Sequence, residues 1–178
     1  MKRKVFLGFL AAALIAALTM PGARAGETAA GKIDAKAAFE KLKGLAGDWT
    51  GTTGQGLATP VTYRVSSNGS VVMETLFPGT EHEMITMYHL VGSDLVATHY
   101  CAEGNQPHFK LDLAKSTPTE LVFGFDGGTN FDPGKDNHIH SARIAFRGDG
   151  QHDEDWAFWA GGKEKGAEKF HLARSAAK

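Results

Sequence analysis

The sequence is short of cysteine, of basic charge and of long apolar stretches. Its 178 residues include a single cysteine, Cys101, so no disulfide can form within the chain and a packed core has to supply the stability. One apolar run, Val5 to Met20, is short for a membrane span, which needs about 20 residues, and it ends at Pro21-Gly22. The C-x-x-C and H-E-x-x-H patterns of common metal sites are also missing.

The first 25 residues are predicted to be a secretory signal peptide. Lys-Arg-Lys at 2–4 precedes the apolar run, and Ala-Arg-Ala at 23–25 supplies the small-x-small cleavage motif. Removing this segment takes away four basic and no acidic residues, which leaves 153 residues with a net charge of −5. We therefore expect a periplasmic or secreted protein with no membrane span after cleavage. An acidic chain without a basic stripe is a poor partner for nucleic acid.

The mature chain is predicted to begin with a flexible stretch at 26–33, followed by one folded domain at 34–175. Asp34 is a suitable N-cap, and apolar residues recur at helical spacing from Ala35 to Ala46, ahead of a stop at Gly47. Beyond Gly47 the apolar period changes to two, which is typical of strands. The clearest runs are Val61-Tyr63-Val65, Leu121-Phe123-Phe125, Ala142-Ile144-Phe146 and Phe170-Leu172.

Turn motifs such as Asn68-Gly69 separate these runs into about ten strands with no helix between them, which indicates a sandwich or a barrel. In an up-and-down order, alternate connections fall at opposite ends. One end receives connections that are mostly tight: 66–69, 91–93, 115–119 and 147–152. The other receives connections that are mostly long: 53–60, 77–83, 102–107, 126–137 and 161–167. We therefore predict an all-β fold, a single closed antiparallel up-and-down barrel with an N-terminal helix capping its closed end.

Gly47-Asp48-Trp49 opens the first strand, and Arg174 follows Leu172 near the end of the last. This combination resembles lipocalin-like (calycin) β-barrels, in which the tryptophan closes the floor and an arginine packs across it. The strand count is closer to that of the ten-stranded fatty-acid-binding and nitrobindin-like barrels, although the helix pair that lids fatty-acid binders is absent. Residues 76–83 and 98–101 also resemble a group of secreted bacterial proteins, a likeness that implies a fold and no activity.

Five of the eight histidines fall near the end with the long connections: His82, His99, His108, His138 and His140. Alternate strand residues share a face, so His138 and His140 lie on the same face as Ile144 and Phe146. This face is expected to point inward. Imidazoles at the mouth of a cup suit a transition metal, haem or a polar head group; a hydrogen-bonded rim is the alternative. Residues 126–137 lack the spacing of a calcium loop and are expected to form a mobile lid.

Three other residues are candidates for the same pocket. Cys101 shares a face with His99, which raises the possibility of a nucleophilic cysteine. The base and the orienting group that a nucleophile needs are not evident in the sequence. The alternative role of Cys101 is to fill apolar space. Glu74 is a pocket anchor if it faces inward, and Trp156 offers aromatic surface that lines either the core or the pocket. The sequence does not decide which face of the strands expected at 70–77, 84–90 and 94–101 points inward. The predicted ligand-binding residues are Glu74, His99, Tyr100, Cys101, His138, His140 and Trp156.

The function predicted from these patterns is that of an exported binding protein that holds a small apolar or amphipathic molecule in the barrel cavity. An enzyme that uses the mouth histidines as acid–base or metal-binding groups is the alternative, and a haem or transition-metal barrel is a second. A filled barrel that binds a partner is a further possibility, which a cavity would distinguish from the others. Catalytic residues, metal ligands and cofactor are left unassigned.

Overall fold

The structure, a computed structural model, describes residues 31–176. The signal peptide predicted for 1–25 and most of the stretch 26–33 lie outside the described residues. One α-helix, α1 (Ala35–Lys43), precedes ten strands. The strands are β1 (Gly47–Thr53), β2 (Ala58–Ser66), β3 (Val71–Leu76), β4 (Met84–Val91), β5 (Asp94–Tyr100), β6 (Gln106–Leu111), β7 (Glu120–Thr129), β8 (His138–Gly148), β9 (Gln151–Ala160) and β10 (Lys163–Arg174).

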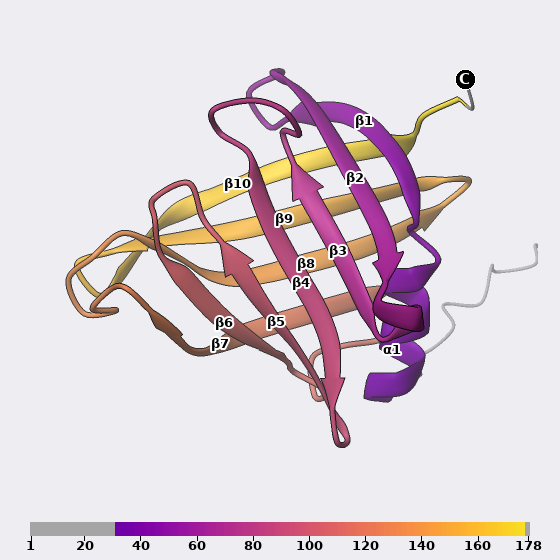
Figure 1. The fold of residues 1–178 in the computed structure, drawn as a ribbon, viewed down its shortest axis with the longest axis horizontal. Helices are drawn as coiled ribbons and strands as arrows, with labels where there is room; N and C mark the ends of the chain where they lie inside the picture. The colour runs from indigo at the N-terminus through magenta and orange to yellow at the C-terminus, as the bar shows by residue number, and fades with distance from the viewer. Residues whose placement is uncertain (1–30, 177–178) are drawn as a thin grey trace, which may run out of the picture.

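The ten strands form one closed barrel. Each strand pairs antiparallel with its neighbours in sequence, and β1 pairs with β10 to close the ring. Figure 1 shows β2 to β5 crossing in front of β8 to β10, with α1 at one end of the barrel. The predicted closed antiparallel up-and-down barrel is therefore confirmed. Closure gives every strand two neighbours, and alternate strand residues face the interior.

Helix α1 covers the end of the barrel that carries the β4–β5 turn. Asp34 caps it as predicted, since its Oδ1 accepts a hydrogen bond from the Ala37 backbone N–H at 2.7 Å. The buried face consists of Ala35, Ala38, Phe39 and Leu42. The helix ends at Lys43 rather than at Ala46, because the Gly44 N–H closes the last helical turn and residues 44–46 continue as tight turns that lead into β1.

The floor of the barrel is built on Trp49, which is only 3% exposed. Its indole N–H donates to the Leu45 carbonyl at 2.7 Å. The Arg174 guanidinium stacks over the ring, with Cζ 4.4 Å from the ring centroid, and donates to the carbonyls of Ala46 at 2.7 Å and Gly44 at 2.8 Å. Arg174 thus joins the last strand, the first strand and the residues that follow α1. Its packing over Trp49 is the contact that the resemblance implies.

The backbone conformation and the space beside Arg174 explain why the Gly47-Asp48-Trp49 motif begins with glycine. Gly47 has a φ of 130°, a backbone conformation that disfavours side chains. A Cβ at this position would lie 2.8 Å from Nη1 of Arg174. Any larger residue would therefore strain the backbone and displace the arginine from the floor.

Five connections lie at the end opposite α1, which we call the open end: 54–57, 77–83, 101–105, 130–137 and 161–162. Two connections differ in kind from the expectation: one is tight where a long loop is expected, and one is long where a tight turn is expected. The expected loop 161–167 is a two-residue turn, because Gly161 and Gly162 both have positive φ and form a tight hairpin. At the helix end, the connection 112–119 is long, and Asp112 orders it by accepting from the backbone N–H groups of Ala114 and Lys115.

The ladder between β7 and β8 is short. Its pairing extends only from Glu120↔Ala145 to Phe123↔Ala142. Beyond that point β7 continues with β6, whereas β8 continues with β9. A seam therefore opens between β7 and β8 toward the open end, and side chains rather than backbone hydrogen bonds fill it.

Candidate functional site

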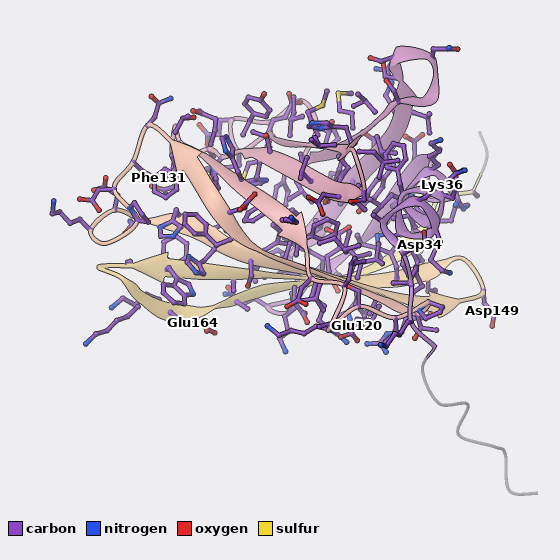
Figure 2. All side chains as sticks on the ribbon, turned by 90° about the horizontal axis from the view of Figure 1, so that it is seen from below. Asp34, Lys36, Glu120, Phe131, Asp149 and Glu164 are labelled. Atoms are coloured by element: carbon purple, nitrogen blue, oxygen red, sulfur yellow. The ribbon has the colours of Figure 1, made fainter. Side chains whose placement is uncertain are left out.

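A pocket of about 270 Å³ lies at the open end of the barrel. Figure 2 labels Phe131 and Glu164 at this end, and Asp34, Lys36 and Asp149 at the opposite end. The pocket is lined by Thr53, Leu57, Leu76, Phe77, Met84, His99, Ile139, Trp156, Glu168 and Phe170. Most of these side chains are apolar, as is usual for small-molecule sites, and a few polar groups are placed among them.

His99 is the distinctive polar group of this pocket. It stands on β5, is 1% exposed, and packs its ring 5.0 Å from that of Trp156. Its Nδ1 lies 2.9 Å from the Thr86 hydroxyl, whereas its Nε2 has no hydrogen-bond partner among residues 31–176. Burial lowers the pKa of His99 to about 4, so the imidazole is neutral at neutral pH.

A larger hollow of about 520 Å³ runs along β1, β2 and residues 174–176. None of its lining residues carries a buried side-chain atom that lacks a partner within the described part of the chain. A buried polar atom without a partner costs free energy that a ligand can recover. This criterion favours the pocket beside His99 over the larger hollow as the candidate site. Asn105 Oδ1 is also buried without a partner among residues 31–176, but the hollow that Asn105 lines is formed mostly by polar residues.

His99 belongs to a row of four polar residues that crosses the barrel wall. The register pairs Tyr63 with Glu74, Glu74 with Thr86, and Thr86 with His99, on β2, β3, β4 and β5. All four are at most 1% exposed. Directly paired residues on antiparallel strands share a face, so one inward residue from each strand builds what we call the polar belt: Tyr63, Glu74, Thr86 and His99.

Glu154 on β9 is the centre of the polar interior. It is fully buried. The Tyr63 phenol donates to Oε1 at 2.5 Å, and the Trp156 indole N–H donates to Oε2 at 3.1 Å. His152 Nε2 lies 2.9 Å from Oε1, and its ring packs edge-on against Trp49 at 4.3 Å. Because an indole N–H can only donate, these contacts identify Glu154 as an acceptor carboxylate.

Glu74 and Glu154 form a carboxyl pair with opposite pKa shifts. Burial raises the pKa of Glu74 well above its usual range, and the charge of Glu154 raises it further. Burial also acts to raise the pKa of Glu154, but the hydrogen bond and charge of His152, together with Glu74 and Tyr63, outweigh it and lower the pKa. The proton of the pair is therefore on Glu74. Burial raises the pKa of Tyr63 and Tyr88, so both phenols remain donors.

The structure separates the predicted ligand-binding residues into groups. His99 and Trp156 line the pocket together. Glu74 faces inward, where it accepts a hydrogen bond from Tyr88 at 2.6 Å, but it is not a lining residue. Tyr100 points to the other face of β5 and is 49% exposed. Cys101 follows the end of the strand, half-buried and outside the lining; burial raises the pKa of its thiol.

His138 and His140 lie in the seam between β7 and β8 rather than in the pocket wall. His138 is fully buried, and its Nε2 is 3.0 Å from Nδ1 of His140. The His140 ring is stacked between Phe125 at 4.5 Å and Trp159 at 3.7 Å. The expected alternation fails here because a β-bulge shifts the register between Ile139 and Ser141. Ile139 consequently lines the pocket in their place.

The sequence analysis missed five residues of the polar interior: Tyr63, Thr86, Tyr88, His152 and Glu154. Two of them could have been predicted from the alternation of residues along the sequence. His152 and Glu154 alternate in phase with Trp156 along one strand, so an inward Trp156 also directs both polar side chains inward. The position of Thr86 depends on the pairing of β4 with its neighbours, which no local pattern reveals.

Comparison with protein-family models and with curated proteins found no match for this chain. The lipocalin-like character therefore rests on the barrel and its floor. Within residues 31–176, no helix has the length and apolar character needed to cross a bilayer. Nor does any group of three or more His, Cys, Asp or Glu side chains in that range have an arrangement suited to a metal ion.

Proposed function

We propose that this protein binds a compact, mainly apolar molecule in the pocket beside His99. The observation that carries the proposal is that His99 lines a largely apolar pocket and has a buried Nε2 without a partner among residues 31–176. Leaving such an atom unsatisfied costs about 1–3 kcal/mol, and a ligand with one complementary polar group removes that cost. The pocket volume of about 270 Å³ is near the lower end of the usual range of roughly 300–1,000 Å³, which favours a compact ligand over a long-chain one.

Binding is better supported than catalysis by the state of His99. A general base is most effective when its pKa is near the working pH. The pKa of His99 is lowered to about 4 by burial, so the ring accepts hydrogen bonds but is a weak base. The predicted signal peptide supports a role as a carrier or sensor of small molecules in the periplasm or outside the cell.

Calorimetric titration with 1-naphthol, a compact fused-ring molecule with a single hydroxyl, tests the proposal. We expect wild-type protein to bind it and an Ile139→Trp variant, in which the new side chain fills the pocket, to lose binding. The matched control is the double variant His138→Ala, His140→Ala, which alters the seam and leaves the pocket lining intact. Loss of binding in the double variant but not in Ile139→Trp would move the site to the seam and refute the proposal.

A further inference from the structure

One acidic side chain, Glu168, borders the pocket beside His99. Glu168 is on β10 and lines the pocket, and the register pairs it directly with Trp156 on β9. Directly paired residues of antiparallel strands share a face, and Trp156 is buried and lines the same pocket. Glu168 therefore lies on the interior face of the barrel, two positions along the strand from the buried Phe170.

The neighbouring strand shows that Glu168 is at the mouth of the pocket rather than in its depth. The ladder between β1 and β10 ends at the pair Thr53↔Phe170, so β10 continues past the end of β1 toward the open end. The loop 54–57 follows β1 there, and its Leu57, which also lines the pocket, is 63% exposed. Glu168 itself is half-buried. A side chain at this place has access both to the apolar interior and to solvent.

The negative charge of Glu168 is not balanced within the pocket. None of the ten lining residues is Lys or Arg. Burial lowers the pKa of His99 to about 4, so the imidazole of the lining is neutral at neutral pH. Within the described part of the chain Glu168 forms no ion pair, and the adjacent Lys169 is exposed on the other face of β10. A carboxylate that borders apolar side chains without a counter-ion favours the binding of a cation.

Aromatic rings supply a second attraction for a cation. Phe77, Trp156 and Phe170 line the pocket together with Glu168. The rings of Phe77 and Phe170 are 6.0 Å apart in an edge-to-face arrangement. The face of an aromatic ring attracts a positively charged group. Rings and one carboxylate at the same pocket therefore suit a molecule with an apolar body and an ammonium group.

We infer that the pocket selects compact apolar amines, whose protonated nitrogen lies beside Glu168 at the mouth while the apolar body occupies the pocket. This inference rests on the proposed function and narrows its ligand class. Neutral molecules of the same shape bind through the apolar contacts alone. Carboxylates of the same shape are disfavoured, because their charge meets the like charge of Glu168.

Calorimetric titration with three probes of similar size tests the selection. The probes are the cation 1-naphthylmethylamine, the neutral 1-naphthalenemethanol and the anion 1-naphthoate. We expect wild type to bind the amine at least about fivefold more tightly than the alcohol, and the carboxylate most weakly. In Glu168→Gln, which keeps the side-chain shape and removes the charge, the ratio of amine to alcohol affinity should fall by at least about threefold, while the affinity for the alcohol stays the same.

Glu164→Gln is the matched control, because it removes the same charge from the same strand at an exposed position outside the pocket lining. The ratio of amine to alcohol affinity should remain that of wild type. Glu168→Lys is the second variant: it reverses the charge at the mouth and should bind 1-naphthoate more tightly than the amine. An equal fall of the ratio in Glu164→Gln and Glu168→Gln would assign the preference to the overall negative charge of the protein and overturn the inference.

The outcomes separate this inference from the proposed function. If wild type binds the alcohol but binds the amine no more tightly, the pocket remains a binding site and the selection of amines is overturned. A wild type that prefers 1-naphthoate overturns the selection as well. If wild type binds none of the three probes, the proposed function fails, and the selection that depends on it fails with it.

Discussion

Replacing Glu74 with glutamine should make the protein more stable than wild type as the pH rises. Glu74 is buried beside Glu154, and its raised pKa means that it is protonated in the folded protein. In the unfolded chain a glutamate ionises near pH 4.5. Folding therefore takes up a proton above this pH, and the contribution of Glu74 to stability is lost progressively as the pH rises toward its folded pKa. Glutamine keeps an oxygen for Tyr88 and stays neutral beside Glu154, yet it has no proton to take up.

The magnitude follows from proton linkage. One proton taken up on folding changes the free energy of unfolding by about 1.4 kcal/mol per pH unit. Between pH 5 and pH 7 the advantage of Glu74→Gln over wild type should therefore grow by about 3 kcal/mol, provided that the folded pKa exceeds 7. Below pH 4.5, where both chains carry a neutral group, the two proteins should be similar in stability.

Urea unfolding followed by tryptophan fluorescence at pH 5, 6, 7 and 8 measures this difference. The exposed residue Glu81 provides the control, because Glu81→Gln makes the same chemical change away from the interior. Glu154→Gln is the informative counterpart: it replaces the acceptor carboxylate and should destabilise by about 3–5 kcal/mol, as the loss of one member of a buried charged network does. A difference between Glu74→Gln and wild type that does not change with pH would show that Glu74 is ionised in the fold, and would refute the assignment.

Three further predictions concern the floor and the pocket. Trp49→Ala should lower the free energy of unfolding by about 3–5 kcal/mol, measured by urea denaturation; a change below 1 kcal/mol would contradict the role of Trp49 in the floor. Gly47→Ala should destabilise by clearly more than Gly56→Ala, since both positions have positive φ but only the former brings a Cβ against Arg174; equal effects would show that backbone strain acts alone. For His99, the folded pKa of about 4 is below the unfolded value of 6.5, so wild type should lose about 3 kcal/mol relative to His99→Gln as the pH falls from 6.5 to 4, and parallel stability curves would exclude a neutral buried ring.

The barrel was predictable because its main determinants are local. Val61 and Tyr63, and likewise Leu121 and Phe123, alternate with more exposed neighbours and are all buried as expected. The period of two is a property of each strand by itself, so it can be recognised without knowing how the strands pair. The floor was predictable for a different reason: the resemblance brought together Trp49 and an arginine more than 120 positions away, and the structure shows the pair in contact.

The candidate site was only partly predictable because it depends on register and closure. Glu74 lies in a run of mostly apolar residues without clean alternation, and its inward direction is fixed by pairing with Tyr63 and Thr86. Glu154 reaches the same interior only because the ring closes through β10 and β1. The bulge before Ser141 inserts one residue into β8 and changes the direction of His140, and nothing in the local pattern distinguishes it from a regular strand.

A crystal structure of the protein grown with 1-naphthol tests the central claim most directly. We expect the fused rings to lie among Leu76, Met84 and Ile139, with the hydroxyl oxygen within hydrogen-bond distance of His99 Nε2. Rings lodged between Phe125 and Trp159 in the seam, or a pocket beside His99 that stays empty at saturating probe, would contradict it.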